Sequence, residues 1–174
     1  KPDPNQFSAN VDLMARTGSE SSESYDVSGH VNLPLVEDKF ALRLVGFSAT
    51  DGGYIDNVLG TSPQLGGIDN ADMVEDHINE VETYGSRVAA KWFINDDWSA
   101  TASGIYQNIE SAGRNTYDPT VGDLQTVKFF QDSRDDEWTQ LSLTIEGRFG
   151  DGFEFVSNTG YFDRETLYTD VRSV

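Results

Sequence analysis

Hydrophobic and polar residues alternate along most of the chain with a period of two. Between Tyr84 and Trp92, for example, Val88 and Ala90 share one side and Arg87 lies on the other. Five other runs alternate in the same way, the run at 40–49 is apolar at most positions and carries Arg43, and helical periodicity is hard to find. The seven runs cover 7–16, 25–33, 40–49, 84–93, 98–107, 140–149 and 153–164. The sequence therefore predicts an all-β fold, an antiparallel up-and-down meander of about seven long strands.

The connections between these runs are alternately short and long. Ile94–Asp97 and Gly150–Gly152 are tight turns, whereas the segments at about 50–83 and 108–136 are long. Strands of about ten residues can cross a bilayer when they tilt. Short turns on one side and long loops on the other are typical of bacterial outer-membrane barrels. We therefore expect part of a transmembrane β-barrel, with 50–83 and 108–136 as outer loops.

Aromatic residues strengthen this expectation, because three runs carry a pair that shares one face eight residues apart. Eight residues span roughly 26 Å along a strand, or roughly 20 Å after a tilt of about 40°, close to the apolar height of such a barrel. Trp138 has the opposite parity to Phe149, so we expect either a bulge or an inward-facing Trp138. The pairs are Tyr84 with Trp92, Trp98 with Tyr106, and Phe153 with Tyr161.

A soluble extracellular β-sandwich that binds carbohydrates or surfaces is the alternative, since its strands also alternate. Alternation alone does not separate the two folds. Aromatic residues at both ends of one face, together with the alternation of short and long connections, favour the barrel.

Composition narrows the classes of function. The 174 residues include 30 acidic and 12 basic side chains, a net charge of −18, and no Lys/Arg cluster, so nucleic acid is excluded as a partner. Cysteine is absent, which removes disulfides, thiolate metal sites and thiol catalysis. No apolar run approaches the roughly 18 residues of a spanning helix.

Several segments resemble TonB-dependent outer-membrane receptors. Lys1–Pro4, which leads into an alternating strand, is similar to the junction between the plug domain and the barrel of that family. Leu42–Phe47 followed by Asp51–Asn57 is similar to the third strand and following loop of proteobacterial receptors. Tyr117-Asp118-Pro119, Val121-Gly122-Asp123-Leu124 and Gly160–Arg164 also resemble the family, and the likeness runs across essentially the whole chain.

The resemblance implies a barrel of about 22 strands in the bacterial outer membrane, filled by a plug. Members of this family actively import siderophores, haem, vitamins or oligosaccharides, with energy from the TonB system. The chain has no secretory signal, TonB-box, plug or C-terminal aromatic strand, and so we interpret it as a partial receptor barrel over 1–174. A passive porin-like channel fits less well, because the matching motifs belong to plugged receptors.

The outer loops supply the candidate ligand-binding residues. The segment 51–83 holds eight acidic residues and no Lys or Arg, which suits ligand capture, binding of a divalent cation, or a solvated loop. Gly52-Gly53 permits close approach of another backbone segment, so the residues after it either anchor the loop or contact ligand. An aromatic beside a carboxylate suits sugar or siderophore contact, and it also suits packing of one loop on another. The candidates are Asp51, Tyr54, Asp56, Asn57, Tyr117 and Asp118.

Three cations are expected on the inward side of the strands. Arg43, Arg87 and Lys91 share the polar parity, so they would face the plug of the full-length protein. His30 and His77 belong to different segments and predict no metal site. No catalytic constellation or cofactor motif occurs, so the sequence predicts a non-enzyme without cofactor or metal. The resemblance implies that the partners are outer-membrane lipid, the plug of the full-length protein, the TonB system and a small-molecule ligand.

Overall fold

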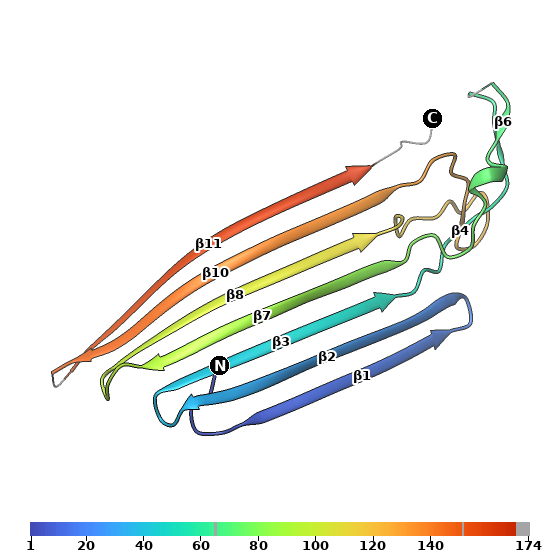
Figure 1. Ribbon diagram of the computed structural model, residues 1–174. Coiled ribbons are helices and arrows are strands. Elements are labelled where there is room, and N and C mark those ends of the chain that lie inside the picture. Colours follow the sequence, from blue (N-terminus) through green and yellow to red (C-terminus); the bar gives the residue numbers. More distant parts are fainter. Residues whose placement is uncertain (65, 151, 170–174) are drawn as a thin grey trace.

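Seven long strands form a single antiparallel sheet in the computed structural model, which describes residues 1–64, 66–150 and 152–169 (Figure 1). Each strand pairs with the long strand next to it in sequence, so the predicted all-β, up-and-down meander is confirmed. The sheet is open, with β1 and β11 at its edges. The strands are β1 (Ser8–Gly18), β2 (Ser21–Val36), β3 (Phe40–Asp51), β7 (Val81–Phe93), β8 (Trp98–Ser111), β10 (Ser133–Phe149) and β11 (Phe153–Thr169).

The two long connections contain the remaining elements. These are β4 (Asp56–Asn57), β5 (Thr61–Ser62), β6 (Ile68–Asp69), the short helix η1 (Ala71–Met73) and β9 (Gln125–Thr126). Figure 1 shows both connections gathered beyond the same end of the sheet. Within the described residues, no helix has the length and apolar character needed to cross a membrane.

The strand registers divide the side chains between two faces. Leu44 pairs with Val88, Val88 with Gly104, and Gly104 with Leu141, so one row of small and aliphatic residues crosses four strands. The face containing this row is called the apolar face below; it carries Val11, Leu13, Val27, Val31, Leu42, Leu44, Val88, Ala90, Ala100, Ala102, Leu141 and Leu143. The opposite polar face carries Asp26, His30, Arg43, Arg87, Lys91, Ser103, Thr144 and Glu146.

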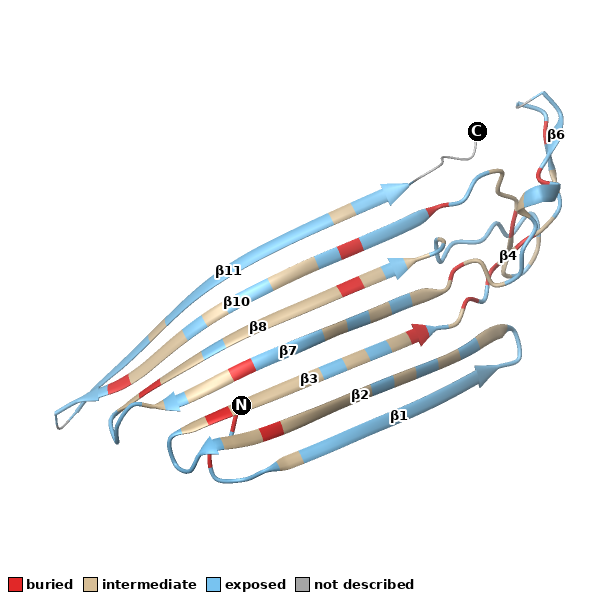
Figure 2. Cartoon of the chain, in the orientation of Figure 1, coloured by how far each residue is buried: buried red, intermediate tan, exposed pale blue. Residues whose placement is uncertain are grey.

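The sheet is a single layer, and large apolar side chains remain exposed on it. Leu13 is 77% exposed and Phe153 is 78% exposed, both on the apolar face. Figure 2 shows most of the strand residues as exposed or intermediate. Among residues 1–64, 66–150 and 152–169 no second sheet covers either face, which is the feature that a β-sandwich requires.

The strands are longer than the sequence pattern predicts. They run from 11 residues in β1 to 17 in β10 and β11, where about ten were expected. The stretch 17–24, expected to be a connection, is mostly strand, with a turn between Gly18 and Ser21. At 108–111 and 133–136, the strand continues through residues assigned to a loop. The ladder of backbone hydrogen bonds persists beyond the alternating region, so the loss of hydrophobic alternation did not mark the strand ends.

Trp138 lies on the polar face, and β10 has no bulge that would reverse it. The register of β10 against β11 is unbroken from Ser133 to Phe149, so a bulge does not explain the parity of Trp138, and the inward-facing alternative is the one the strand register fits. The Trp138 ring lies 5.9 Å from that of Phe162 on the neighbouring strand. Register shifts occur instead between Arg16 and Gly18 and between Pro34 and Val36.

The aromatic side chains of the apolar face form two rows. Near the short turns, Trp98 lies 4.9 Å from Phe149 and 6.0 Å from Phe155, measured between ring centres. Near the long connections, the rings of Tyr84 and Tyr106 are 6.3 Å apart. The apolar face carries no Asp, Glu, Lys or Arg between the two rows in the described strands. The lower row is Phe40, Trp92, Trp98, Phe149, Phe153 and Phe155, and the tyrosine row is Tyr25, Tyr84, Tyr106 and Tyr161.

Both rows cross the strands obliquely. Leu167 of β11 is in register with Tyr25 of β2, whereas Tyr161 lies six residues nearer the short turn. Over five strand-to-strand steps, the row shifts by about 20 Å along the strands while it advances about 24 Å across them. It is therefore inclined by about 40° to the direction of the inter-strand hydrogen bonds. The lower row is inclined in the same direction. Ser157 of β11 is in register with Phe40 of β3, whereas Phe153 lies four residues nearer the short turn, which gives an inclination of about 35° over four strand-to-strand steps.

Candidate functional site

The two long connections are held together by backbone pairing. β4 and β9 form a two-stranded parallel ladder, with hydrogen bonds of 2.9 Å from Asp56 N to Leu124 O and from Val58 N to Thr126 O. Ala112 N also donates to Glu80 O. Segments far apart in sequence therefore form one loop assembly at the end of the sheet (Figure 1).

Asn57 is the central anchor of this assembly. Its side chain is 3% exposed, and its Nδ2 donates to the carbonyls of Met73 and Lys128. Its Oδ1 accepts from the Lys128 amide at 2.7 Å. Asn70, also buried, donates to the carbonyls of Val58 and Lys128. Two asparagine amides thus satisfy backbone groups from both connections, which buried loop backbone requires.

Gly52 and Gly53 allow the first connection to leave the sheet between two other backbone segments. A Cβ on Gly53 would lie 1.9 Å from His77 O, and one on Gly52 would lie 2.3 Å from Ser22 O. The predicted close backbone approach at this double glycine is confirmed. Asn79 then accepts from the amides of Tyr54 and Ile55 at 2.7 and 2.9 Å, which fixes the following turn.

A cavity of about 730 Å³ opens between the two connections. Its size is in the range of small-molecule sites. Its wall combines the segment from Asp72 to Glu80 with residues from Lys128 to Asp132. The remaining lining comes from Ser22, Asn57, Ala112 and Gly113.

Carboxylates dominate the charge of this cavity. Asp72, Glu75, Asp76 and Glu80 line it, and Asp132 is 6% exposed and ion-paired with Lys128. Phe130, which is 52% exposed, adds an apolar surface. A mixture of one accessible aromatic face and several hydrogen-bond acceptors suits a polar, uncharged or cationic small molecule.

The predicted ligand residues are only partly brought together. Of the six, Asn57 alone lines the cavity, and its amide is occupied by loop backbone. Asp56 accepts from the amide of His77 at 3.0 Å and so helps to shape the cavity wall. Asp51 pairs with Arg16 at 2.9 Å at the C-terminal end of β3, and Tyr54, three residues further along the chain, is exposed. Ligand contact by these residues remains a prediction.

Tyr117 and Asp118 belong to an exposed turn of the second connection. Asp118 Oδ1 accepts from the Thr120 hydroxyl at 2.7 Å and from the Thr120 amide at 2.9 Å. These hydrogen bonds, the one from the hydroxyl foremost, hold the pKa of the Asp118 carboxyl below its usual range. The carboxylate therefore stabilises its own turn.

Arg43, Arg87 and Lys91 lie together on the polar face, on the neighbouring strands β3 and β7. Among the described residues none of the three forms an ion pair with a carboxylate. The N-terminal segment approaches the same face, because Asn32 accepts from Asp3 N at 2.9 Å and donates to Asp3 O and Gln6 O. The segment that resembles the plug junction is thus fixed to the polar face of the sheet.

Sequence reasoning missed the cavity residues His77, Lys128, Phe130 and Asp132. His77 has φ of 59°, a left-handed conformation, and its carbonyl oxygen lies 1.9 Å from where a Cβ on Gly53 would be. The acidic character of 51–83 was the one available signal. The pairing of the two connections through β4 and β9 leaves no signal in the sequence, because these strands are only two residues long.

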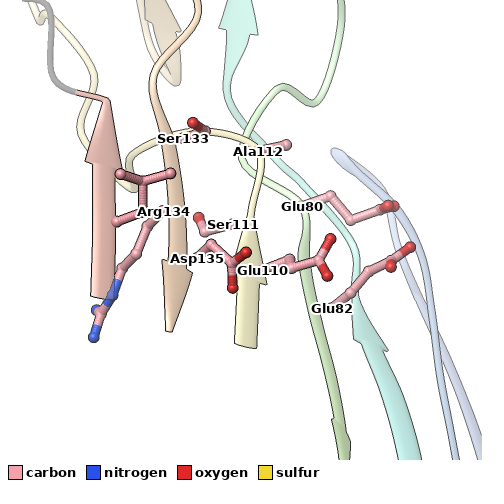
Figure 3. A pocket seen from close by; sticks show the side chains of 9 residues that line it. Glu80, Glu82, Glu110, Ser111, Ala112, Ser133, Arg134 and Asp135 are labelled. Atoms are coloured by element: carbon pink, nitrogen blue, oxygen red, sulfur yellow. The ribbon is translucent and has the colours of Figure 1, made fainter. Parts of the chain in front are cut away.

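A second hollow, of about 350 Å³, lies on the apolar face beyond the tyrosine row (Figure 3). Glu82, Glu110 and Asp135 are register neighbours on β7, β8 and β10, and their carboxylates gather there. Charged residues thus return to this face directly outside the aromatic boundary. Within the described part of the chain, no group of three or more His, Asp or Glu side chains is placed to hold a metal ion.

Comparison of the chain with protein-family models, with curated proteins and with solved structures gave no match.

Proposed function

We propose that this chain is a barrel segment of a TonB-dependent receptor in the bacterial outer membrane, which takes up a small ligand actively. The observation that carries the proposal is the uncharged, exposed apolar face, bounded by two aromatic rows. An apolar surface of this extent on a single-layer sheet requires a nonpolar environment. Lipid supplies it in an outer-membrane barrel, whose outward band is flanked by aromatic girdles.

The inclination of the rows supports the same proposal. Strands of such barrels tilt by about 35–45° from the membrane normal. Two planes parallel to a membrane would therefore cross the strand registers at that angle, as the rows do at about 35° and about 40°. A sheet covered by a second protein layer has no reason to place aromatic residues along two oblique, parallel lines.

The polar face and the loop assembly suit a receptor. Arg43, Arg87 and Lys91 would face the plug, as expected from the sequence. The cavity between the two connections would capture ligand on the outer side, with Phe130 and the carboxylates as its contact surface. Siderophores, haem, vitamins and oligosaccharides are the ligand classes that the family resemblance implies. The proposed role is transport, not catalysis.

The chain's own tryptophans test the membrane location. Trp92 and Trp98 lie on the apolar face and Trp138 on the polar face. In bilayers of lipids with brominated acyl chains, variants that keep only Trp92 or only Trp98 should lose most of their fluorescence. A variant that keeps only Trp138 should retain it. Equal quenching of all three, or quenching of Trp138 alone, would contradict the proposal.

Receptor function needs a separate experiment. Cells that express the full-length protein should accumulate a ferric siderophore, haem, cobalamin or a maltooligosaccharide from a labelled panel. Accumulation should stop when a protonophore collapses the proton-motive force or when TonB is deleted. Accumulation that continues under both conditions would favour a passive channel, and uptake of nothing in the panel would count against a receptor for these classes.

A further inference from the structure

Two arginines share one buried carboxylate at the outer end of the polar face. Asp136 on β10 is 2% exposed and accepts from Arg164 on β11 through Nε at 2.7 Å and through Nη2 at 2.6 Å. Its Oδ2 also accepts from Arg134 Nη2, and Thr166 Oγ1 lies 3.3 Å from its Oδ1. The carboxylate is therefore saturated, and it holds both guanidinium groups in fixed positions.

The cluster retains a net positive charge and unused donors. Two guanidiniums face one carboxylate, which leaves one positive charge. The side chains of Arg134 and Arg164 are 43% and 47% exposed. Each guanidinium has five N–H donors, and Asp136 takes only one from Arg134 and two from Arg164. Asp136 therefore leaves seven of the ten guanidinium N–H donors unused.

Aromatic rings surround this charge on the same face. Trp138 is the register partner of Arg164, and its ring contacts that of Phe162. The Arg134 guanidinium lies 5.3 Å from the centre of the Tyr168 ring. Phe162 and Tyr168 are both exposed. Fixed cations therefore adjoin an accessible apolar surface, a combination that binds an anionic head on a planar body.

The register neighbours of the cluster on β8 are uncharged. The β8 register partners of Arg134, Asp136 and Trp138 are Ser111, Ile109 and Gln107, all neutral. The carboxylates of Glu82, Glu110 and Asp135 lie on the other face of the sheet. Figure 3 shows the guanidinium of Arg134 turned away from them. Arg134 is also one of the residues that line the hollow holding these carboxylates, but its guanidinium extends on the polar side of β10.

We propose that Arg134 and Arg164, positioned by Asp136, bind a small molecule that carries one carboxylate on a planar apolar body. The net charge of the cluster matches a monoanion, and the two guanidiniums offer the paired donors that a carboxylate accepts. Trp138 and Phe162 provide the surface for the body of the ligand. The site depends on this cluster alone, so it does not require the proposed receptor function.

Fluorine NMR on the full-length protein in detergent tests the site, with para-fluorobenzoate as the probe and para-fluorobenzamide as its neutral counterpart. The carboxylate should bind saturably, and the amide about tenfold more weakly or less. Arg164→Gln should weaken binding of the carboxylate by about tenfold or more. Arg16→Gln is the matched control, because Arg16 is an exposed arginine paired with Asp51 at the outer end of β1, and binding should be unchanged.

Asp136→Asn separates positioning from simple attraction. It raises the net charge of the cluster, so attraction alone predicts tighter binding, whereas the loss of fixed geometry predicts weaker binding. Arg164→Lys keeps the charge without the two-pronged donor and should also bind more weakly, which guards against misfolding of Arg164→Gln. The proposal is overturned by absence of saturable binding up to about 10 mM, by equal binding of both probes, or by wild-type binding in Arg164→Gln.

Discussion

Replacement of Asn57 by alanine should release the two long connections from each other. The side-chain amide of Asn57 bonds the backbone of Lys128, 71 residues further along the chain, in the interior of the loop assembly. The alanine variant would leave the Lys128 amide and the Met73 carbonyl without partners, whereas Lys128 O keeps its bond from Asn70. The seven-stranded sheet should be unaffected, because no strand of that sheet contributes to this network.

The magnitude follows from those two orphaned groups. A buried polar group without a partner costs about 1–3 kcal/mol, so the variant should lose about 2–4 kcal/mol from the free energy that closes the assembly, after partial hydration of the groups. At about 1.4 kcal/mol per factor of ten, exchange of the protected loop amides should accelerate by about thirty- to a thousandfold.

Hydrogen–deuterium exchange measures this directly. Peptides that contain Val58 and Lys128 should exchange faster in Asn57→Ala, and peptides from β7 and β8 should not change. Asn158→Ala is the matched control, because it removes an exposed side-chain hydrogen bond of 2.6 Å to Thr144 on the sheet. Loop exchange within about threefold of the wild type would refute the anchoring role of Asn57.

Three further predictions concern the sheet and the second connection. Val88→Arg, in the middle of the apolar face, should lower the free energy of unfolding in bilayers, measured by urea titration, by about 2–4 kcal/mol. The control Thr144→Arg, on the polar face, should lose much less. Equal losses in the two variants would count against a lipid-facing Val88. Gly147→Val should displace the Trp98 ring, whose Cε3 lies 2.5 Å from a Cβ at that position, with a change in Trp98 fluorescence and a loss of about 1–3 kcal/mol; an unchanged spectrum would refute the contact. The hydrogen bonds from Thr120 lower the pKa of Asp118. The stability that ionised Asp118 gives its turn is therefore complete above the pKa of this group in the unfolded chain, and it disappears as pH falls through the lower folded pKa. In the wild type, the Thr120 amide should lose protection from hydrogen exchange in acid, whereas in Asp118→Ala its protection should be low and independent of pH.

Alternation predicts the sheet well because it reports which face each side chain occupies. Alternation predicts the run 140–149 as a strand, and the register with β8 and β11 places its Leu141, Leu143 and Ile145 on one face. The same signal failed at the strand ends. Beyond Tyr106, the strand continues through Asn108 and Glu110, where polar residues occupy both faces and parity carries no hydrophobic contrast.

The loop assembly was far less predictable. The close approach at Gly52-Gly53 follows from local chemistry, since two successive glycines remove two Cβ atoms. The bonds from Asn57 to Met73 and Lys128 and the cavity beside Phe130 depend on contacts between distant segments. Arg134, Asp136 and Arg164 form a cluster through cross-strand register, and a one-residue slip would disperse them to opposite faces.

The central claim is that the apolar face contacts lipid, and a nitroxide scan of β7 tests it most directly. The chain has no native cysteine, so each introduced cysteine carries a unique label. In bilayers, labels at 86, 88 and 90 should be accessible to oxygen dissolved in the lipid. Labels at 87, 89 and 91 should be shielded from it and should favour a water-soluble nickel reagent where solvent reaches them. Nickel access that is highest at the even-numbered positions, or no alternation along the strand, would contradict the account.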